Sequence, residues 1–186
     1  MKVDNNGWLS GVRKIASANY DQRPSGSQID LLVIHNISLP PEQFGGQAIV
    51  QFFTNRLNTK EHPYYEQLKG VKVSSHFLIR RDGEIIQFVP CRGRAWHAGV
   101  SSWQGRTRCN DFSLGVELEG SDTVLFTDRQ YASLTRLTRC LQRSYRLSSI
   151  EGHSDIAPGR KTDPGPHFDW LRYLATVNAD IKKPTH

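Results

Sequence analysis

A short segment near the C-terminus, EGHSDIAPGRKTDPGPHFDW (151–170), combines His153 and Asp163 with three prolines and three glycines. Prolines and glycines turn the backbone, and a plain surface loop would need nothing more. Imidazole and carboxylate groups are ligands for zinc. The segment therefore indicates a loop whose turns aim His153 and Asp163 at one point, with Lys161 close by in the sequence.

A further histidine, His35, ends the apolar run LLVIH (31–35), which is typical of a strand buried on both faces. The run SSIEGH predicts a short strand that ends at His153. In open α/β sheets, functional sites gather at the carboxyl ends of the strands, so these two imidazoles could lie side by side. With Asp163 they would form a three-ligand zinc site whose fourth position is open to water. Such a site polarises a carbonyl group and lowers the pKa of bound water to about 7.

The spacing alone leaves other sets of ligands open. His76 or His97 could replace either histidine, and Asp155 could replace Asp163. A histidine at a strand end can also be explained by a hydrogen bond that satisfies it there. This simpler explanation suffices for the remaining histidines, which are His62, His167 and His186.

Two glutamates and a lysine are candidates for proton transfer and charge stabilisation. In SLGVELEG (113–120) the pattern alternates, so Glu117 and Glu119 share one face of a predicted strand. A solvated face would explain both. The functional alternative is that one of them is a general base beside the metal site, and alternation cannot choose between them. Lys161 is either a surface lysine or a group that stabilises a developing oxyanion.

The elements that would position these residues alternate between strands and helices. AIVQFFTNRL (48–57) and FDWLRYLATV (168–177) have helical spacing. TDRQYASLTRLTRCLQRSYR (127–146) predicts a helix with a capping box at Thr127 and Gln130 and an apolar stripe that runs to Tyr145.

The strands include a predicted hairpin, because SHFLIRRDGEIIQFVP (75–90) places two alternating runs around Asp82-Gly83. EHPYYEQLKGVKVS (61–74) is predicted to be irregular. Helices that alternate with strands, with one hairpin embedded, predict an α/β fold with a central mixed β-sheet flanked by α-helices. The length of 186 residues predicts a single domain over 1–186.

Composition narrows the classes of function. With 37% hydrophobic and 23% charged residues, the chain is typical of a soluble globular protein rather than a disordered one. The net charge of +6 suits an anionic small substrate. The basic residues are scattered and form no nucleic-acid-binding motif, so we expect no nucleic-acid partner. No apolar stretch is long enough to span a membrane, and no obligate protein partner is evident.

The three cysteines, Cys91, Cys109 and Cys140, are odd in number and widely spaced, which favours free thiols in a reducing compartment. The N-terminal residues MKVDNNGWLSGVRKIAS contain no apolar core of a signal peptide. We therefore expect a cytoplasmic protein.

Four stretches together resemble one family over most of the chain, from about residue 8 to residue 173. They are LLVIHNISLPPEQFGG, HFLIRRDGEIIQFVP, RAWHAGVSSWQGRTRCNDFSLGVELEG and GHSDIAPGRKTDPGPHFDW, and YDQRP upstream adds to the resemblance. The chain resembles the zinc-dependent N-acetylmuramoyl-L-alanine amidases, most closely the cytoplasmic AmpD-type branch that acts on 1,6-anhydro-muropeptides in peptidoglycan recycling. Related peptidoglycan recognition proteins and phage amidases commonly have a cysteine at the position of Asp163, so the aspartate favours that branch.

The resemblance implies roles for individual residues. It implies one zinc ion per chain, bound by His35, His153 and Asp163. It also implies that Glu117 is the catalytic carboxylate and Lys161 the second catalytic residue. The implied fold, a mixed sheet flanked by helices, agrees with the fold inferred from the residues.

The implied substrate is a small muropeptide, cleaved between N-acetylmuramic acid and L-alanine. By the same resemblance, we expect the substrate groove to be lined by Asn36, Trp96, His97 and Arg108. The alternative is a binding module of this fold that holds muropeptides without cutting them. Non-catalytic members of the fold lose a metal ligand, whereas this chain retains all three positions, which favours the enzyme.

Overall fold

The computed structural model describes residues 1–177. The helices are α1 (Ala48–Phe53), α2 (Asp128–Gln142), α3 (His153–Ile156) and α4 (Trp170–Thr176), with 3-10 helices η1 (Pro63–Leu68) and η2 (Cys109–Asp111). The strands are β1 (Arg13–Lys14), β2 (Tyr20–Gln22), β3 (Leu31–Ile37), β4 (Phe77–Ile79), β5 (Ile85–Gln87), β6 (Gly93–Ala95), β7 (Ser102–Trp103), β8 (Arg106–Thr107), β9 (Ser113–Glu119) and β10 (Ser149–Gly152).

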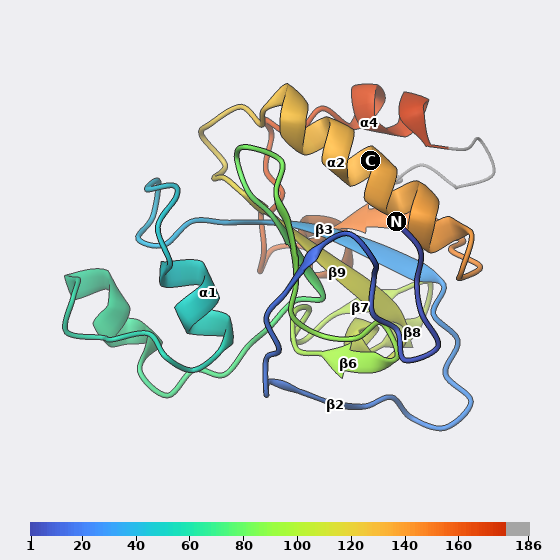
Figure 1. The fold of residues 1–186 in the computed structure, drawn as a ribbon, viewed down its shortest axis with the longest axis horizontal. Coiled ribbons are helices and arrows are strands. Elements are labelled where there is room, and N and C mark those ends of the chain that lie inside the picture. The colour runs from blue at the N-terminus through green and yellow to red at the C-terminus, as the bar shows by residue number, and fades with distance from the viewer. Residues whose placement is uncertain (178–186) are drawn as a thin grey trace.

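The central sheet has six strands in the order β1-β5-β4-β9-β3-β10. Strands β4, β9, β3 and β10 run parallel, whereas β4 and β5 form an antiparallel pair. Figure 1 shows β3 and β9 crossing the middle of the molecule, with α2 and α4 packed together over one face. The prediction of a mixed sheet flanked by helices is therefore confirmed.

Alternate side chains of the buried strands pack on opposite faces. Leu32 and Ile34 of β3 join the apolar side of α2 in one core cluster, and Leu31 and Val33 join a different cluster. Both faces of β3 are covered, which explains why its sequence is uninterrupted apolar rather than alternating. Leu137 of α2 is fully buried, and its truncation to alanine would cost about 2–5 kcal/mol.

Helix α2 begins with the predicted capping box. The backbone N of Gln130 donates to Oγ1 of Thr127 at 3.1 Å, and the backbone N of Thr127 donates to Oε1 of Gln130 at 3.1 Å. The helix ends at Gln142, so Tyr145, which was assigned to its apolar stripe, lies beyond it. Tyr145 still packs against the same core cluster.

Other boundaries differ from the predicted ones. Helix α1 ends at Phe53 rather than residue 57, and Asn55 takes a left-handed conformation just after it. The predicted hairpin is formed by β4 and β5. Its turn is one residue longer than a two-residue loop, because Arg80 and Glu84 are still paired and Gly83 has a φ of 85°.

Several short elements were not predicted. The segment 61–74 was predicted to be irregular, but it contains η1, which begins with Pro63 after the cap residue His62. The helix predicted over 168–177 is α4, which spans Trp170–Thr176.

No helix within residues 1–177 is long and apolar enough to cross a membrane. The predicted single domain over 1–186 extends past the described residues and stays a prediction, and His186 also lies outside them.

Candidate active site

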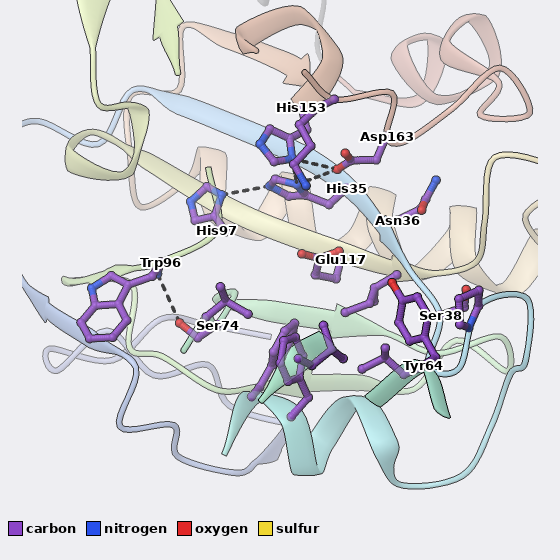
Figure 2. A pocket seen from close by; sticks show the side chains of 18 residues that line it. His35, Asn36, Ser38, Tyr64, Ser74, Trp96, His97, Glu117, His153 and Asp163 are labelled. Atoms are coloured by element: carbon purple, nitrogen blue, oxygen red, sulfur yellow. Dashed lines mark hydrogen bonds and ion pairs between the residues drawn. The ribbon is translucent and has the colours of Figure 1, made fainter. Parts of the chain in front are cut away.

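Three side chains that could hold a metal ion meet at the carboxyl ends of β3 and β10. Nδ1 of His35 lies 3.0 Å from Nδ1 of His153, and Oδ2 of Asp163 lies 2.9 Å from the first and 3.0 Å from the second. Figure 2 shows the three side chains converging from separate segments. The possible ligand atoms of His35, His153 and Asp163 all lie within 4.8 Å of one another, which is close enough for one metal ion to bind all three.

Sheet register brings the two histidines together. Ile34 of β3 is paired with Gly152 of the parallel strand β10. The next residue of the chain is in each case a histidine: His153 directly follows β10, and His35 lies within β3, which continues to Ile37 rather than ending at His35 as predicted. His153 is the first residue of α3, so the chain turns away from the sheet directly after supplying this imidazole.

The loop that carries Asp163 is attached to the strand ends by backbone contacts. The carbonyl of Asp163 accepts a hydrogen bond from the backbone N of Ser154 at 2.9 Å. A Cβ on Gly152 would lie 2.9 Å from Cδ of Pro164, so a glycine is required where this loop crosses β10. The alternative ligand Asp155 is engaged elsewhere, because its Oδ2 accepts from the backbone N of Gly152 at 2.6 Å.

The charge states of His35 and Asp163 suit a divalent cation. Burial lowers the pKa of His35 to about 4, although the hydrogen bond to Asp163 opposes this effect. His35 is therefore neutral at neutral pH, as a metal ligand must be. Burial would raise the pKa of Asp163, but the two imidazoles beside it outweigh burial and hold that pKa below its usual value.

Glu117 lies beside this cluster, because it is the residue of β9 paired with His35. It is 8% exposed, and its Oε2 has no hydrogen-bond partner among the described residues. Burial, followed by the charge of Asp163, raises the pKa of Glu117 well above its usual value, whereas Lys161 acts in the opposite direction. The explanation of a solvated glutamate face is therefore wrong, since β9 is buried along its whole length.

Glu119 differs from Glu117 although both side chains leave the same face of β9. Its Oε1 accepts from the backbone N of Gly45 at 2.7 Å, and its Oε2 accepts from the backbone N of Arg81 at 3.1 Å. Its Oε1 also lies 3.5 Å from Nη1 of Arg80. These bonds connect three segments of the chain, so Glu119 has a structural use that Glu117 lacks.

A cleft of about 370 Å³ opens onto the cluster. Lys161 lines it, on the exposed loop between α3 and Asp163. The opposite wall is largely apolar and comes from the segment between β3 and β4. The cleft-lining residues of that wall include Leu39, Pro41, Phe52, Phe53, Tyr64, Leu68 and Val73.

The model of the N-acetylmuramoyl-L-alanine amidase family matches residues 25–166, which contain the cluster, Glu117 and Lys161. The chain belongs to this amidase family. It is 53% identical over 176 residues to the 1,6-anhydro-N-acetylmuramyl-L-alanine amidase AmpD of Escherichia coli (strain K12), covering 94% of this chain and 96% of that protein.

Two solved structures of amidases resemble the fold. The crystal structure of a selenomethionine AmpD derivative is 53% identical and superposes with a TM-score of 0.93 over 96% of this chain and 100% of that chain. The amidase AmiD of E. coli, solved with the substrate anhydro-N-acetylmuramic acid-L-Ala-D-gamma-Glu-L-Lys, is 30% identical with a TM-score of 0.58. That match covers 83% of this chain and 60% of that chain.

The four residues predicted to line the amidase groove have different environments. Trp96 and Asn36 line the cleft. Nδ2 of Asn36 donates to Oδ1 of Asp122 at 2.7 Å and to the carbonyl of Pro164 at 3.1 Å. This amide therefore also holds the loop that carries Asp163.

His97 lines the cleft too, but its nitrogens are occupied: Nδ1 lies 2.9 Å from Nε2 of His35, and Nε2 lies 3.2 Å from Oγ of Ser113. Arg108 is not among the described residues that line the cleft. Its side chain is 67% exposed and pairs with Asp111 at 3.3 Å. Substrate contact by these four residues stays a prediction.

The sequence did not reveal the residues that contact the ligand histidines from the side away from Asp163. Asn110 and Ser113 lie near His97 in space, yet no local pattern distinguishes them from surface residues. Gly115 was a usable signal, since glycine within a buried strand often marks close approach of another group. A Cβ there would lie 2.6 Å from Cγ of His97.

Proposed function

We propose that this amidase uses one zinc ion per chain and cleaves the amide between 1,6-anhydro-N-acetylmuramic acid and the L-alanine of a muropeptide stem, in cytoplasmic peptidoglycan recycling. The observation that carries the proposal is the His–His–Asp cluster with an unpartnered, buried Glu117 on the adjacent strand. The 1,6-anhydro substrate is supported by the similarity to AmpD and by the anhydro substrate bound to AmiD. The free cysteines are compatible with a reducing compartment.

The donor set fits zinc. Tetrahedral zinc with Zn–N distances of about 2.0–2.1 Å would place its ligand atoms about 3.3 Å apart, close to the separations of 2.9–3.0 Å among His35, His153 and Asp163. When bound there, zinc supplies a Lewis acid that polarises the scissile carbonyl and makes an adjacent water more acidic.

The residues of the chain would then move one proton and hold one charge. The carboxylate of Glu117 accepts a proton from the attacking water as the water oxygen bonds to the carbonyl carbon. The same carboxyl group donates that proton to the alanine nitrogen as the C–N bond breaks. The ammonium group of Lys161 stabilises the negative charge that develops on the carbonyl oxygen.

A non-catalytic binding module would need none of this arrangement. Keeping a buried carboxylate unpartnered costs about 1–3 kcal/mol or more, and binding alone gives no reason for such a cost. The unpartnered oxygen of Glu117 therefore supports the hydrolase over the binding module.

The cytoplasmic setting also bears on substrate choice. Wall precursors carry the same lactyl–alanine bond on a sugar linked to a diphosphate, and a cytoplasmic amidase must spare them. The anhydro ring removes the substituent at C1, so the cleft can discriminate by excluding that bulky anionic group. We expect nucleotide-linked muropeptide to be cleaved more slowly by about a hundredfold or more, a gap of about 3 kcal/mol.

The test is mass spectrometry of the products formed from a defined anhydro-muropeptide, with and without a chelator. The proposal predicts free tripeptide or tetrapeptide and anhydro-N-acetylmuramic acid, and no products after chelation. Bound but uncleaved muropeptide would contradict the hydrolase. Equal specificity constants for the anhydro and nucleotide-linked substrates would overturn the recycling role while leaving the amidase chemistry intact.

A further inference from the structure

The two imidazoles of the cluster are supported from behind by two consecutive residues of one loop. Nε2 of His35 lies 2.9 Å from Nδ1 of His97, and Nε2 of His153 lies 3.0 Å from the carbonyl oxygen of Ala98. Figure 2 shows the ring of His97 beside that of His35, on the side away from Asp163. This pair of residues, which we term the 97–98 segment, follows β6.

The chemistry of imidazole makes these contacts consequential. A neutral ring that binds a cation through Nδ1 must carry its proton on Nε2. The carbonyl of Ala98 can only accept, and at 3.0 Å it lies closer to Nε2 of His153 than the donor Nη2 of Arg160 at 3.4 Å, so it favours this tautomer of His153. For His35 the same tautomer requires that Nδ1 of His97 accept a hydrogen bond. The proton of His97 then lies on its Nε2, within 3.2 Å of Oγ of Ser113.

The position of the 97–98 segment is itself fixed by one buried side chain. Oδ1 of Asn110 accepts from the backbone N of His97 at 3.2 Å and from that of Ala98 at 2.8 Å. Asn110 is 7% exposed and lies in η2. A further bond to the carbonyl of Ala98 comes from Nη2 of Arg160 at 2.8 Å. Gly115 leaves the space that the ring of His97 occupies against β9.

We infer that the 97–98 segment, held by Asn110, positions both imidazole ligands and selects the tautomers that bind the metal ion. His97 and Asn110 are thus positioning residues that set metal affinity through His35 and His153. The inference rests on the proposed zinc site.

The first test compares two substitutions of similar size at one position. His97→Leu removes the acceptor from His35, whereas the amide oxygen of His97→Asn can occupy the position of Nδ1. Loss of a group that orients a ligand typically weakens metal binding by about 10–100-fold. We expect this loss for His97→Leu and a smaller one for His97→Asn. The readout is the zinc Kd, measured by competition with a chromophoric chelator.

A second readout uses no metal. Without the ion, the carboxylate of Asp163 would itself accept a proton from Nδ1 of His35 at 2.9 Å, so the spectra are recorded on the metal-free Asp163→Ala protein. In its ¹⁵N–¹H NMR spectra, His35 should carry its proton on Nε2, both with His97 intact and with His97→Asn. His97→Leu should give a mixture of tautomers. A merely structural role for His97 would not alter this signature.

Variants of Asn110 test whether the residue that holds the 97–98 segment also affects zinc binding. They also cover the case in which His97→Leu fails to fold. Asn110→Leu removes the shared acceptor, whereas Asn110→Asp keeps it. We therefore expect a higher zinc Kd, meaning weaker binding, only for the leucine variant. Thr138→Val is the control, because Thr138 is fully buried on α2 with its hydroxyl 2.6 Å from that of Tyr173. It should lower stability and leave the zinc Kd unchanged.

A zinc Kd within about twofold of the wild type in both His97→Leu and Asn110→Leu would overturn the inference. So would an Nδ1-protonated His35 in the Asp163→Ala protein that retains His97. If the wild-type chain binds no zinc at all, the proposed function fails instead, and the NMR spectra still decide whether His97 selects the tautomer of His35.

Discussion

The two walls of the cleft are built in different ways. The wall that carries the His–His–Asp cluster and Glu117 comes from β9, β3 and the end of β10, three adjacent parallel strands of which β10 is the edge strand of the sheet. The opposite wall comes from α1, η1 and the loops around them. Figure 1 shows α1 and the segment that follows it standing to one side of the sheet. The first wall is built from the strands of the central sheet, whereas the second comes from a short helix, a 3-10 helix and loops that pack against the sheet.

The difference extends to their side chains. His35 and His153 are 1% and 3% exposed, and each ring has hydrogen-bond partners at both nitrogens. On the opposite wall, Leu68 and Val73 are partly buried apolar groups on six-residue or irregular elements. Bond-making chemistry depends on fixed positions, whereas an apolar wall only has to exclude water and match a shape. Substitutions on the first wall should therefore change turnover, and those on the second should change KM.

The largest effect should follow loss of a metal ligand. Asp163→Ala should release zinc and lower kcat/KM by about a thousandfold or more, because the ion contributes several kcal/mol of transition-state stabilisation. Zinc content and turnover would be measured on the same preparation. The matched control is Asp155→Asn, since Asp155 caps α3 and does not join the cluster. Full metal content in Asp163→Ala would refute this ligand.

A smaller but still large effect is expected from Glu117→Gln. The amide cannot accept the proton of water, so kcat should fall by about 10²–10⁴-fold while zinc content stays normal. Glu119→Gln is the control on the same strand face and should lose less turnover, because Glu119 binds backbone groups far from the metal cluster. Equal losses in the two variants would contradict the role of Glu117.

The pH profile sharpens the same prediction. A base must be deprotonated to act, so activity should fall as pH decreases through the pKa of Glu117. Burial raises that pKa, so the loss should begin at a higher pH than an exposed glutamate would give. A profile that stays flat down to the ordinary range of glutamate would argue that another group is the base.

An intermediate effect should follow Lys161→Met. Removing one donor that stabilises an oxyanion typically costs about 10²–10³-fold in kcat. Zinc should remain bound, because Lys161 is not a ligand. Lys72→Met, a substitution of another exposed lysine, provides the control for a simple change in net charge. Near-normal kcat in Lys161→Met would leave Glu117 and the metal ion as the catalytic groups on this wall.

Sequence reasoning performed differently on the two walls for a physical reason. The apolar run before His35 and the breakers around Asp163 are local signals, because a strand buried on both faces and a tight loop each need particular residues. The choice between Glu117 and Glu119 was not local. It depends on which carboxylate meets the backbone of Gly45 and Arg81, and those segments are distant in sequence.

The opposite wall gave weaker signals still. The segment 61–74 was predicted to be irregular, although η1 supplies Tyr64 and Leu68 to the cleft. Short elements of this kind carry too few residues for a periodic pattern to be recognised. The role predicted for His97 illustrates a further gap, because its hydrogen bonds to His35 and Ser113 come from the packing of separate strands.

The smallest effects should come from the predicted substrate contacts, and two of them can be compared directly. Trp96 lines the cleft, so Trp96→Leu should raise KM by about 2–10-fold through loss of about 0.5–1.5 kcal/mol of aromatic contact, with kcat little changed. Arg108 is 67% exposed and already paired with Asp111. An exposed ion pair contributes about 0–1 kcal/mol, so Arg108→Ala should change KM by about fivefold at most, and salt should weaken the effect. Steady-state kinetics at low and high ionic strength would measure both variants. An unchanged KM in Arg108→Ala at low salt would remove Arg108 from the groove, whereas a fall in kcat for Trp96→Leu would mean that the rim of the cleft is coupled to the metal wall through the neighbouring 97–98 segment.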